Sequence, residues 1–341
     1  MSDPYLLAAS LLTVGPVSAP PPPPLVPNLF ENLSALLASA KAHQSHSVVT
    51  QPLISGVEIP SVEFSSSPLR QVREFSSSSA SAKTIWNTNL PVSPKPQSPV
   101  ISPQSGTQLY YQRFAALKAG QTYTRLSADS FQSVWSEAKL TKPTHTQWKQ
   151  LLAEEAKAMA RGQGNNRLSI LVGDSLSLWF PTANLPKSQF WLNQGISGEN
   201  SSQILERLSA FSQTRPDTIY VMAGTNDLRQ GVRDRVIVDN TRQIIQRLRQ
   251  NHPQAQIIVQ SILPTRLSAI GSDRIHNLNQ QIAAIAQQEG AGYLNLHSLF
   301  VDNQGQMQRE LTTDGIHLAR RGYAVWQNAL NYADALILAN R

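Results

Sequence analysis

Short apolar runs alternate with amphipathic segments through the second half of the chain, from residue 167 to residue 341. Five runs are predicted to be strands: 168–172, 189–192, 218–222, 256–262 and 293–296. The segments between them carry one apolar stripe each at helical spacing: Ile204, Leu205, Leu208 and Phe211; Ile237, Ile244, Ile245 and Leu248; Ile275, Leu278, Ile282 and Ile285. A last helix is expected over 319–338. This alternation predicts an α/β fold, a three-layer αβα sandwich with a flavodoxin-like five-stranded parallel sheet and its site at the carboxyl ends of the strands.

A helical pattern without strands precedes this domain, from about residue 107 to residue 166. Four residues of its first part recur at helical spacing: Phe131, Val134, Trp135 and Ala138. Five more do so after Pro143: Trp148, Leu151, Leu152, Ala156 and Met159. Thr144 and Gln147 have the spacing of a capping box at the start of the second helix. We expect a short helical extension that packs on the domain behind it.

Residues 1–106 have neither helical nor strand periodicity and are rich in Ser and Pro, with a proline run at 20–24. Such a composition buries too little apolar surface to offset the entropy of ordering, so it predicts a disordered spacer. An apolar segment at its start ends in Val17-Ser18-Ala19, a pattern typical of a signal-peptidase site, but the charged residue ahead of it is Asp3 rather than Lys or Arg. Export or N-terminal anchoring and a cytoplasmic location both remain open.

Composition narrows the function classes. The 341 residues include no cysteine, which excludes disulfide scaffolds, thiolate metal sites and cysteine nucleophiles. The chain lacks an uninterrupted run of eighteen apolar residues, so a multi-span membrane protein is excluded and membrane contact could involve only the N-terminal segment. The net charge of +7 is thinly spread, at 0, +4 and +3 over residues 1–106, 107–166 and 167–341. Without a basic patch, nucleic-acid binding is not expected.

Polar and glycine residues gather where the predicted strands end. The four groups are Gly173-Asp174-Ser175-Leu176, the stretch 193–200 with Gly195 and Gly198, Ala223-Gly224-Thr225-Asn226-Asp227, and Thr313-Asp314-Gly315-Ile316-His317-Leu318. Taken singly, each also fits ordinary turn and helix-cap chemistry. The carboxyl ends of parallel strands share one edge of the sheet, so we expect the four groups to converge.

His317 is the histidine best suited to activate a serine. A serine hydroxyl needs a base, and a histidine oriented by a carboxylate supplies one. Asp314 precedes His317 by three positions in a glycine-containing turn. The other histidines are interpreted as bystanders: His43, His46, His145, His252, His276 and His297. A metal site on Asp314 and His317 is less favoured, because the pattern offers only two ligands.

In this order, the four groups resemble the four sequence blocks of the SGNH (GDSL) hydrolase superfamily, over about residues 168–338. The resemblance implies that Ser175 is the nucleophile, His317 the base and Asp314 its orienting carboxylate. It also implies an oxyanion hole formed by the backbone N–H groups of Ser175 and Gly198 and the side chain of Asn226. It requires no metal or organic cofactor. The blocks do not account for residues 1–166.

The resemblance leads us to expect a hydrolase domain over 167–341, behind the spacer 1–106 and the helical extension 107–166. The expected activity is cleavage of carboxylic esters through an acyl-enzyme, with a small-molecule, lipid or glycan ester as substrate. Three alternatives stay open: an acyltransferase, a carbohydrate O-acetyl esterase acting on a cell-envelope glycan, or a non-catalytic binding protein on the same fold. The sequence does not determine the oligomeric state.

Overall fold

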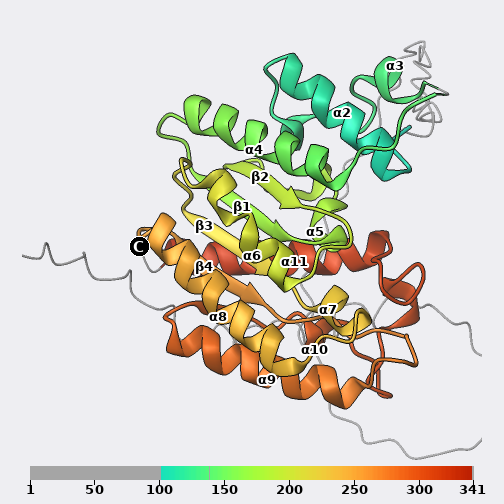
Figure 1. The fold of residues 1–341 in the computed structure, drawn as a ribbon, viewed down its shortest axis with the longest axis vertical. Helices are drawn as coiled ribbons and strands as arrows, with labels where there is room; N and C mark the ends of the chain where they lie inside the picture. The colour runs from blue at the N-terminus through green and yellow to red at the C-terminus, as the bar shows by residue number, and fades with distance from the viewer. Residues whose placement is uncertain (1–100, 138, 340–341) are drawn as a thin grey trace, which may run out of the picture. The chain divides into compact units, whose positions relative to one another are not determined.

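A computed structural model describes residues 101–339 of the chain, apart from residue 138 (Figure 1). Residues 1–100 of the predicted disordered spacer 1–106, with its signal or anchor segment, lie outside the described residues, whereas helix α2 already begins at Gly106. Five parallel strands form one sheet in the order β2-β1-β3-β4-β5, which confirms the predicted flavodoxin-like sheet. Their bounds are β1 Leu168–Gly173, β2 Phe190–Gly195, β3 Thr218–Met222, β4 Gln256–Gln260 and β5 Gly292–Leu294.

Helices cover both faces of this sheet. The α-helices are α2 Gly106–Lys118, α3 Gln132–Trp135, α4 His145–Gly162, α5 Ser175–Leu178, α6 Ser201–Glu206, α7 Thr225–Arg229, α8 Asp234–Asn251, α9 Ser272–Gln288, α10 His297–Phe300 and α11 Arg320–Ala339. Single 3-10 turns lie at η1 Tyr123–Arg125, η2 Thr182–Asn184, η3 Leu208–Phe211 and η4 Arg309–Leu311. Helices α4, α8 and α9 lie in front of the sheet and α11 behind it (Figure 1).

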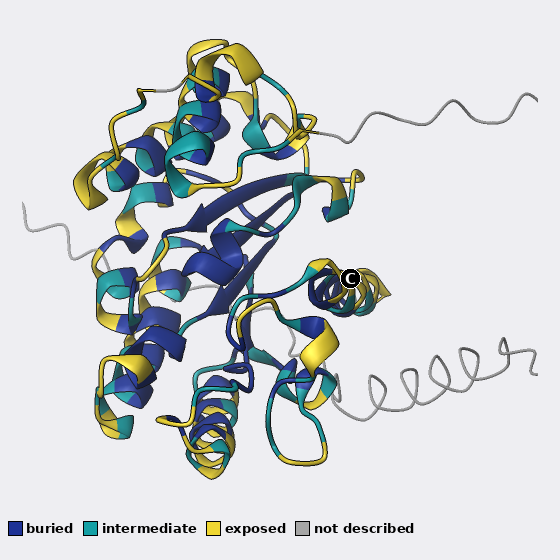
Figure 2. Ribbon diagram, turned by 90° about the vertical axis from the view of Figure 1, so that its right-hand side faces the viewer, coloured by how far each residue is buried: buried dark blue, intermediate teal, exposed yellow. Residues whose placement is uncertain are grey.

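The pleat of the strands divides the core into two layers. In β1, Ile170 and Val172 point to the layer that includes α8 and α9, and Leu171 points to the layer that includes α11. Side chains alternate between the faces of a strand, so an entirely buried strand supplies both layers. Figure 2 shows most of the sheet buried, with β1 buried along its whole length, and the helices buried on their inward sides. Helix α11 is also held by Asp334, which accepts hydrogen bonds from Tyr220 Oη at 2.5 Å and Gln189 Nε2 at 2.7 Å.

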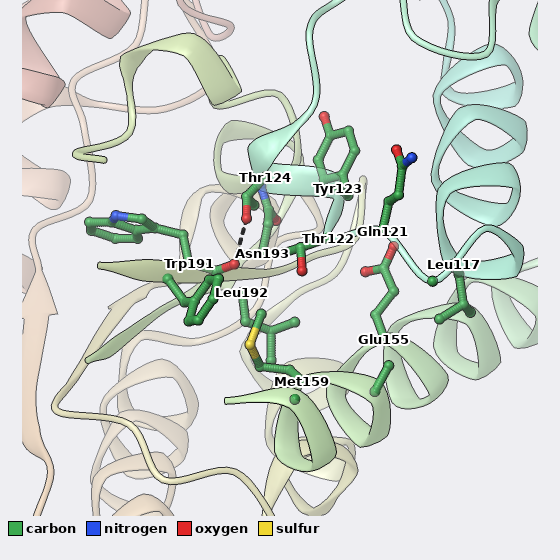
Figure 3. A pocket seen from close by; sticks show the side chains of 14 residues that line it. Leu117, Gln121, Thr122, Tyr123, Thr124, Glu155, Met159, Trp191, Leu192 and Asn193 are labelled. Atoms are coloured by element: carbon green, nitrogen blue, oxygen red, sulfur yellow. Dashed lines mark hydrogen bonds between the residues drawn. The ribbon is translucent and has the colours of Figure 1, made fainter. Parts of the chain in front are cut away.

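The N-terminal helices cover the outer edge of the sheet at β2. Three side chains of this part donate to alternate carbonyl groups along that edge: Arg125 to Gln189 at 2.9 Å, Thr124 to Trp191 at 2.6 Å and Arg113 to Asn193 at 2.8 Å. These bonds satisfy carbonyl groups that an uncovered edge strand leaves unpaired. Figure 3 shows the Thr124 bond beside a cavity of about 260 Å³ between η1, α4 and β2.

The helix expected from the spacing of residues 131–138 is reduced to the single turn α3. Phe131 has a φ of 59°, in the left-handed region, and so cannot belong to a right-handed helix. Trp135 is buried and donates from Nε1 to Ser130 O at 2.8 Å, whereas Val134 is exposed. The apolar spacing here reflects one buried anchor rather than a helical stripe. The capping box of Thr144 and Gln147 at the start of α4 is confirmed.

Candidate active site

Ser175 lies directly beyond β1, as the first residue of α5. Asp174 is the N-cap of that helix, and its Oδ1 accepts from the backbone N–H of Leu176 at 3.0 Å. A side-chain cap of this kind satisfies an N–H group that the first turn of a helix leaves unpaired. Ser175 is 9% exposed, so only a small part of this residue is accessible to solvent.

His317 reaches Ser175 from the loop before α11. Its Nε2 is 3.2 Å from Ser175 Oγ, and its Nδ1 is 2.6 Å from Asp314 Oδ2. A carboxylate accepts hydrogen bonds, so the proton of the neutral imidazole is expected on Nδ1, which leaves Nε2 free to accept from the serine hydroxyl. The structure thus brings together the three residues of the expected triad.

Backbone groups hold the Asp314 carboxylate in place. Its Oδ1 accepts from the N–H groups of Ile316 at 3.0 Å and His317 at 2.8 Å. Burial acts to raise the pKa of Asp314, but the hydrogen bonds from the His317 ring and from these two N–H groups outweigh burial and lower the pKa. The side chains of His317 and Asp314 are 41% and 52% exposed, so water can reach the imidazole.

Asn226 connects the residues that flank two other predicted site residues, Ser175 and Gly198. Its side chain is buried, and Nδ2 donates to Asp174 Oδ2 at 3.1 Å and to Glu199 O at 3.0 Å. Arg229 donates to Asn226 Oδ1 at 3.1 Å, which sets the orientation of the amide. The amide therefore bridges the residue before Ser175 and the residue after Gly198.

Gly198 lies in the exposed turn between β2 and α6, with a φ of +84°. This left-handed conformation favours glycine, and the space that a Cβ would occupy is open. A ligand atom can therefore approach the Gly198 backbone closely.

Asp174 carries an unusual pKa. Desolvation by burial raises the pKa of this carboxyl to about 6, although the hydrogen bond from the Leu176 N–H and the charge of His317 lower the pKa. Repulsion from the Asp227 carboxylate raises the pKa further. A titratable group of this kind beside Ser175 and Asn226 makes the charge of the site dependent on pH near neutrality.

Three residues near Gly198 were not predicted to belong to the site. Glu199 is buried and pairs with Arg207 and with His145, which sequence reasoning had treated as a bystander. Glu199 could have been noticed, because it directly follows Gly198 within the second sequence block. The 54 positions that separate it from His145 leave no local signal for that pair.

The aromatic residues after α5 have separate roles. Phe180 is 1% exposed and packs edge-on against Trp326 and Tyr323. It is therefore a core residue. Trp179 is partly buried between two core clusters. Arg266, in the segment after Leu263, donates from its backbone N–H to Gly315 O at 2.8 Å and so supports the loop of His317.

The cavity of Figure 3 is separate from this arrangement, since none of the 14 residues that line it is a predicted site residue. Within residues 101–339, no cluster of three His, Asp or Glu side chains is placed to hold a metal ion. In the same part of the chain, no helix combines the length and apolar character needed to span a bilayer.

Comparison with known proteins identifies the family of the chain. The model of the GDSL-like lipase/acylhydrolase family matches residues 143–325. Platelet-activating factor acetylhydrolase IB subunit alpha1 of Pongo abelii is 27% identical over 173 residues, which are 48% of this chain and 73% of that protein. The subunit from Homo sapiens is 26% identical over the same shares.

Among solved structures, a Streptococcus pneumonia protein named after platelet activating factor is 25% identical, with a TM-score of 0.51. The match covers 56% of this chain and 94% of that protein. The family model extends over more than half of the sequence and includes all four strand-end groups. The chain therefore belongs to the GDSL-like lipase/acylhydrolase family, which supports an ester-hydrolysing activity.

Proposed function

We propose that this protein is a serine esterase in which Ser175 is the nucleophile, His317 the general base and Asp314 the residue that orients His317. The observation that carries the proposal is the continuous chain of contacts, 3.2 Å from Ser175 Oγ to His317 Nε2 and 2.6 Å from His317 Nδ1 to Asp314 Oδ2. Both distances are within the range expected of a base that takes a proton from a nucleophile and of the group that orients it.

Acylation begins when Ser175 Oγ attacks the ester carbonyl carbon and His317 Nε2 accepts the hydroxyl proton. The carbonyl oxygen becomes an oxyanion in a tetrahedral intermediate. The imidazolium then returns its proton to the oxygen of the leaving alcohol as the carbon–oxygen bond breaks. Ser175 is left as an acyl ester, and Asp314 stabilises the imidazolium while it exists.

The oxyanion is assigned to the backbone N–H groups of Ser175 and Gly198 and to the side chain of Asn226. Both hydrogens of the Asn226 amide are donated, to Asp174 Oδ2 and Glu199 O. An oxyanion bound by Asn226 must therefore share one of these two hydrogens. Fixed donors of this type stabilise a developing charge without reorganising, which makes them effective in catalysis.

Deacylation reverses these roles with water in place of the alcohol. His317 removes a proton from water, the hydroxide attacks the acyl carbon, and Ser175 leaves with the proton held by His317. The half-exposed side chains of His317 and Asp314 give water direct access to the base. No residue role in this scheme calls for a metal or an organic cofactor.

We assign an acetyl or other short acyl ester as the substrate. The support is the similarity to relatives named as acetylhydrolases, over 48% of this chain. Lipid and glycan acetyl esters both remain substrate candidates, because the surface around Ser175 is shaped by loops. Hydrolysis rates over a panel of p-nitrophenyl esters of increasing acyl length, followed by acetylated sugars and an acetylated phospholipid, distinguish them.

The test of the reaction uses the full chain and p-nitrophenyl acetate. The wild type should hydrolyse the ester and become labelled by a fluorophosphonate, and Ser175→Ala should do neither. Ser177→Ala is the matched control, because Ser177 lies in the same helix and its buried Oγ has no hydrogen-bond partner among the described residues. Full hydrolysis by Ser175→Ala would rule out the assigned nucleophile, and a wild type without turnover or labelling would favour a binding protein.

A further inference from the structure

A buried ion pair lies directly behind the proposed oxyanion hole. The Glu199 side chain is 1% exposed, and its Oε2 accepts from Arg207 Nε at 2.5 Å. A buried carboxylate needs partners for both oxygens, because taking it out of water costs several kcal/mol. The second oxygen, Oε1, lies 2.8 Å from Nε2 of His145.

This pair is connected to the residues of the site by its backbone and by Arg207. The Glu199 carbonyl accepts from Asn226 Nδ2 at 3.0 Å. Arg207 Nη2 donates to Gly173 O at 3.1 Å and Gln194 O at 2.7 Å, at the carboxyl ends of β1 and β2. The Glu199 carboxylate therefore determines where the Gly198–Glu199 backbone lies relative to the strand that carries Ser175.

His145 is the member of this cluster that precedes the first strand of the sheet in the sequence. It is the first residue of α4, behind the Thr144 capping box, so its backbone position is defined by the helix start. Helix α4 is itself joined to β2, because Gln194 Nε2 donates to Leu152 O at 3.1 Å. The His145 side chain is 43% exposed, whereas those of Glu199 and Arg207 are 1% and 5% exposed.

We propose that His145 is a positioning residue for the oxyanion hole: its Nε2–H holds the Glu199 carboxylate, and Glu199 in turn holds Gly198 and Asn226. The inference rests on the proposed function, since it assigns the N-terminal helices a role in that reaction. His145 does not contact the reacting atoms. Its loss removes one of two partners of a buried carboxylate and lets the Gly198 turn move, and small displacements of oxyanion donors reduce turnover.

The first experiment compares His145→Ala, His145→Gln and the wild type in p-nitrophenyl acetate hydrolysis. His145→Ala should lower kcat roughly 10-fold with little change in KM, because the donors act on the transition state rather than on the bound ester. His145→Gln should regain most of the rate, because a glutamine Nε2–H can donate to Glu199 from a similar position. His276→Ala is the control, as His276 is exposed on α9 and pairs with Gln280.

A second readout does not depend on turnover. Hydrogen exchange at the amides of residues 196–200 should be faster in His145→Ala than in the wild type, and normal in His145→Gln. Unchanged kcat and exchange in His145→Ala overturn the inference, as does a His145→Gln variant as impaired as the alanine variant. Faster exchange throughout the protein also overturns it, since it indicates general destabilisation. A wild type without esterase activity defeats the proposed function, and the exchange comparison still decides whether His145 holds the turn.

Discussion

The hydroxyl of Ser175 lies 3.2 Å from Nε2 of His317, although 142 positions separate the two residues in the sequence. The contact forms because β1 ends at Gly173, two residues before Ser175, and the loop before α11 returns to the same edge of the sheet. Parallel topology places the ends of distant segments side by side in this way. The following expectations depend on that arrangement.

Asp314→Asn should preserve the fold and lower kcat by about 10⁴-fold, because an amide can stabilise the wrong imidazole tautomer and cannot stabilise the imidazolium. His317→Ala should reduce kcat at least as strongly. The measurement is steady-state hydrolysis at pH 7.5, with circular dichroism to verify folding. A folded Asp314→Asn enzyme with wild-type kcat would mean that another group orients His317.

Asn226→Ala should lower kcat by about 10²- to 10³-fold, the usual effect of removing one oxyanion donor. KM should change much less, because the lost hydrogen bond acts mainly on the tetrahedral state. Asn277→Ala, an exposed amide on α9, is the control and should retain the wild-type rate. If the two variants hydrolyse ester equally well, Asn226 serves only to connect Asp174 and Glu199.

Gly195→Ala should both destabilise the protein and reduce activity. A Cβ at Gly195 would collide with backbone atoms of Leu178 and with the carbonyl of Asp174, which lie in and before the helix of Ser175. Overpacking against backbone costs about 3 kcal/mol of unfolding free energy. Gly162→Ala, at the exposed end of α4 with open space around it, should be neutral or slightly stabilising. Urea denaturation of both variants tests this, and equal stability would mean that α5 adjusts freely.

The sequence predicts most of the sheet, because the central strands β1 and β3 are buried on both faces and so appear as largely apolar runs. The predicted third strand, 218–222, has the bounds of β3. The predicted fourth strand continues to residue 262, whereas β4 ends at Gln260. The apolar run continues because Ile262 is still buried, but its N–H and C=O pair with the Asn279 side chain rather than with a strand.

The polar contacts of the N-terminal helices with the sheet cannot be predicted from apolar periodicity. Arg113 and Thr124 donate to carbonyl groups of β2, and Arg125 donates to the carbonyl of Gln189 just before it. Arg113 does so from α2, and Thr124 and Arg125 do so from η1. The pair between His145 and Glu199 likewise follows from the packing of α4 against the sheet. Periodicity reports which face of an element is buried, whereas a polar contact between distant segments depends on tertiary placement.

His252 should make the protein less stable as the pH falls from 6.5 towards 4. Desolvation lowers the pKa of this buried ring to about 4, although a backbone hydrogen bond at Thr214 acts upward. Below pH 6.5 the unfolded chain binds a proton that the folded protein does not. The contribution of His252 to the unfolding free energy is therefore fully present above that pH and is lost on acidification. The loss at pH 5 is at most about 2 kcal/mol. Urea unfolding at pH 7.5 and pH 5 should show a smaller loss in His252→Gln, and equal losses would contradict the buried neutral ring.

Asp174 should make the protein less stable as the pH rises from about 4 to about 6, which is the opposite of the effect of His252. Its carboxyl has a pKa of about 6 in the folded protein against an ordinary value of 3.8, chiefly because burial disfavours the charged form. Between these values the folded protein retains a proton that the unfolded chain releases, so stability falls as the pH rises from about 4 to about 6. The contribution lost by pH 7 is on the order of 3 kcal/mol.

Asp174→Asn removes this titration while keeping a side-chain oxygen that can accept from Leu176 or Asn226. The variant loses one acceptor, so its stability at any single pH is a poor guide. The informative quantity is the difference in unfolding free energy between the variant and the wild type, measured by urea denaturation at several pH values. We expect this difference to shift in favour of Asp174→Asn by about 2 kcal/mol between pH 4 and pH 7, because ionisation of the buried carboxyl penalises only the wild type. A difference that stays constant across this range would mean that the carboxyl beside Ser175 titrates as an exposed aspartate does.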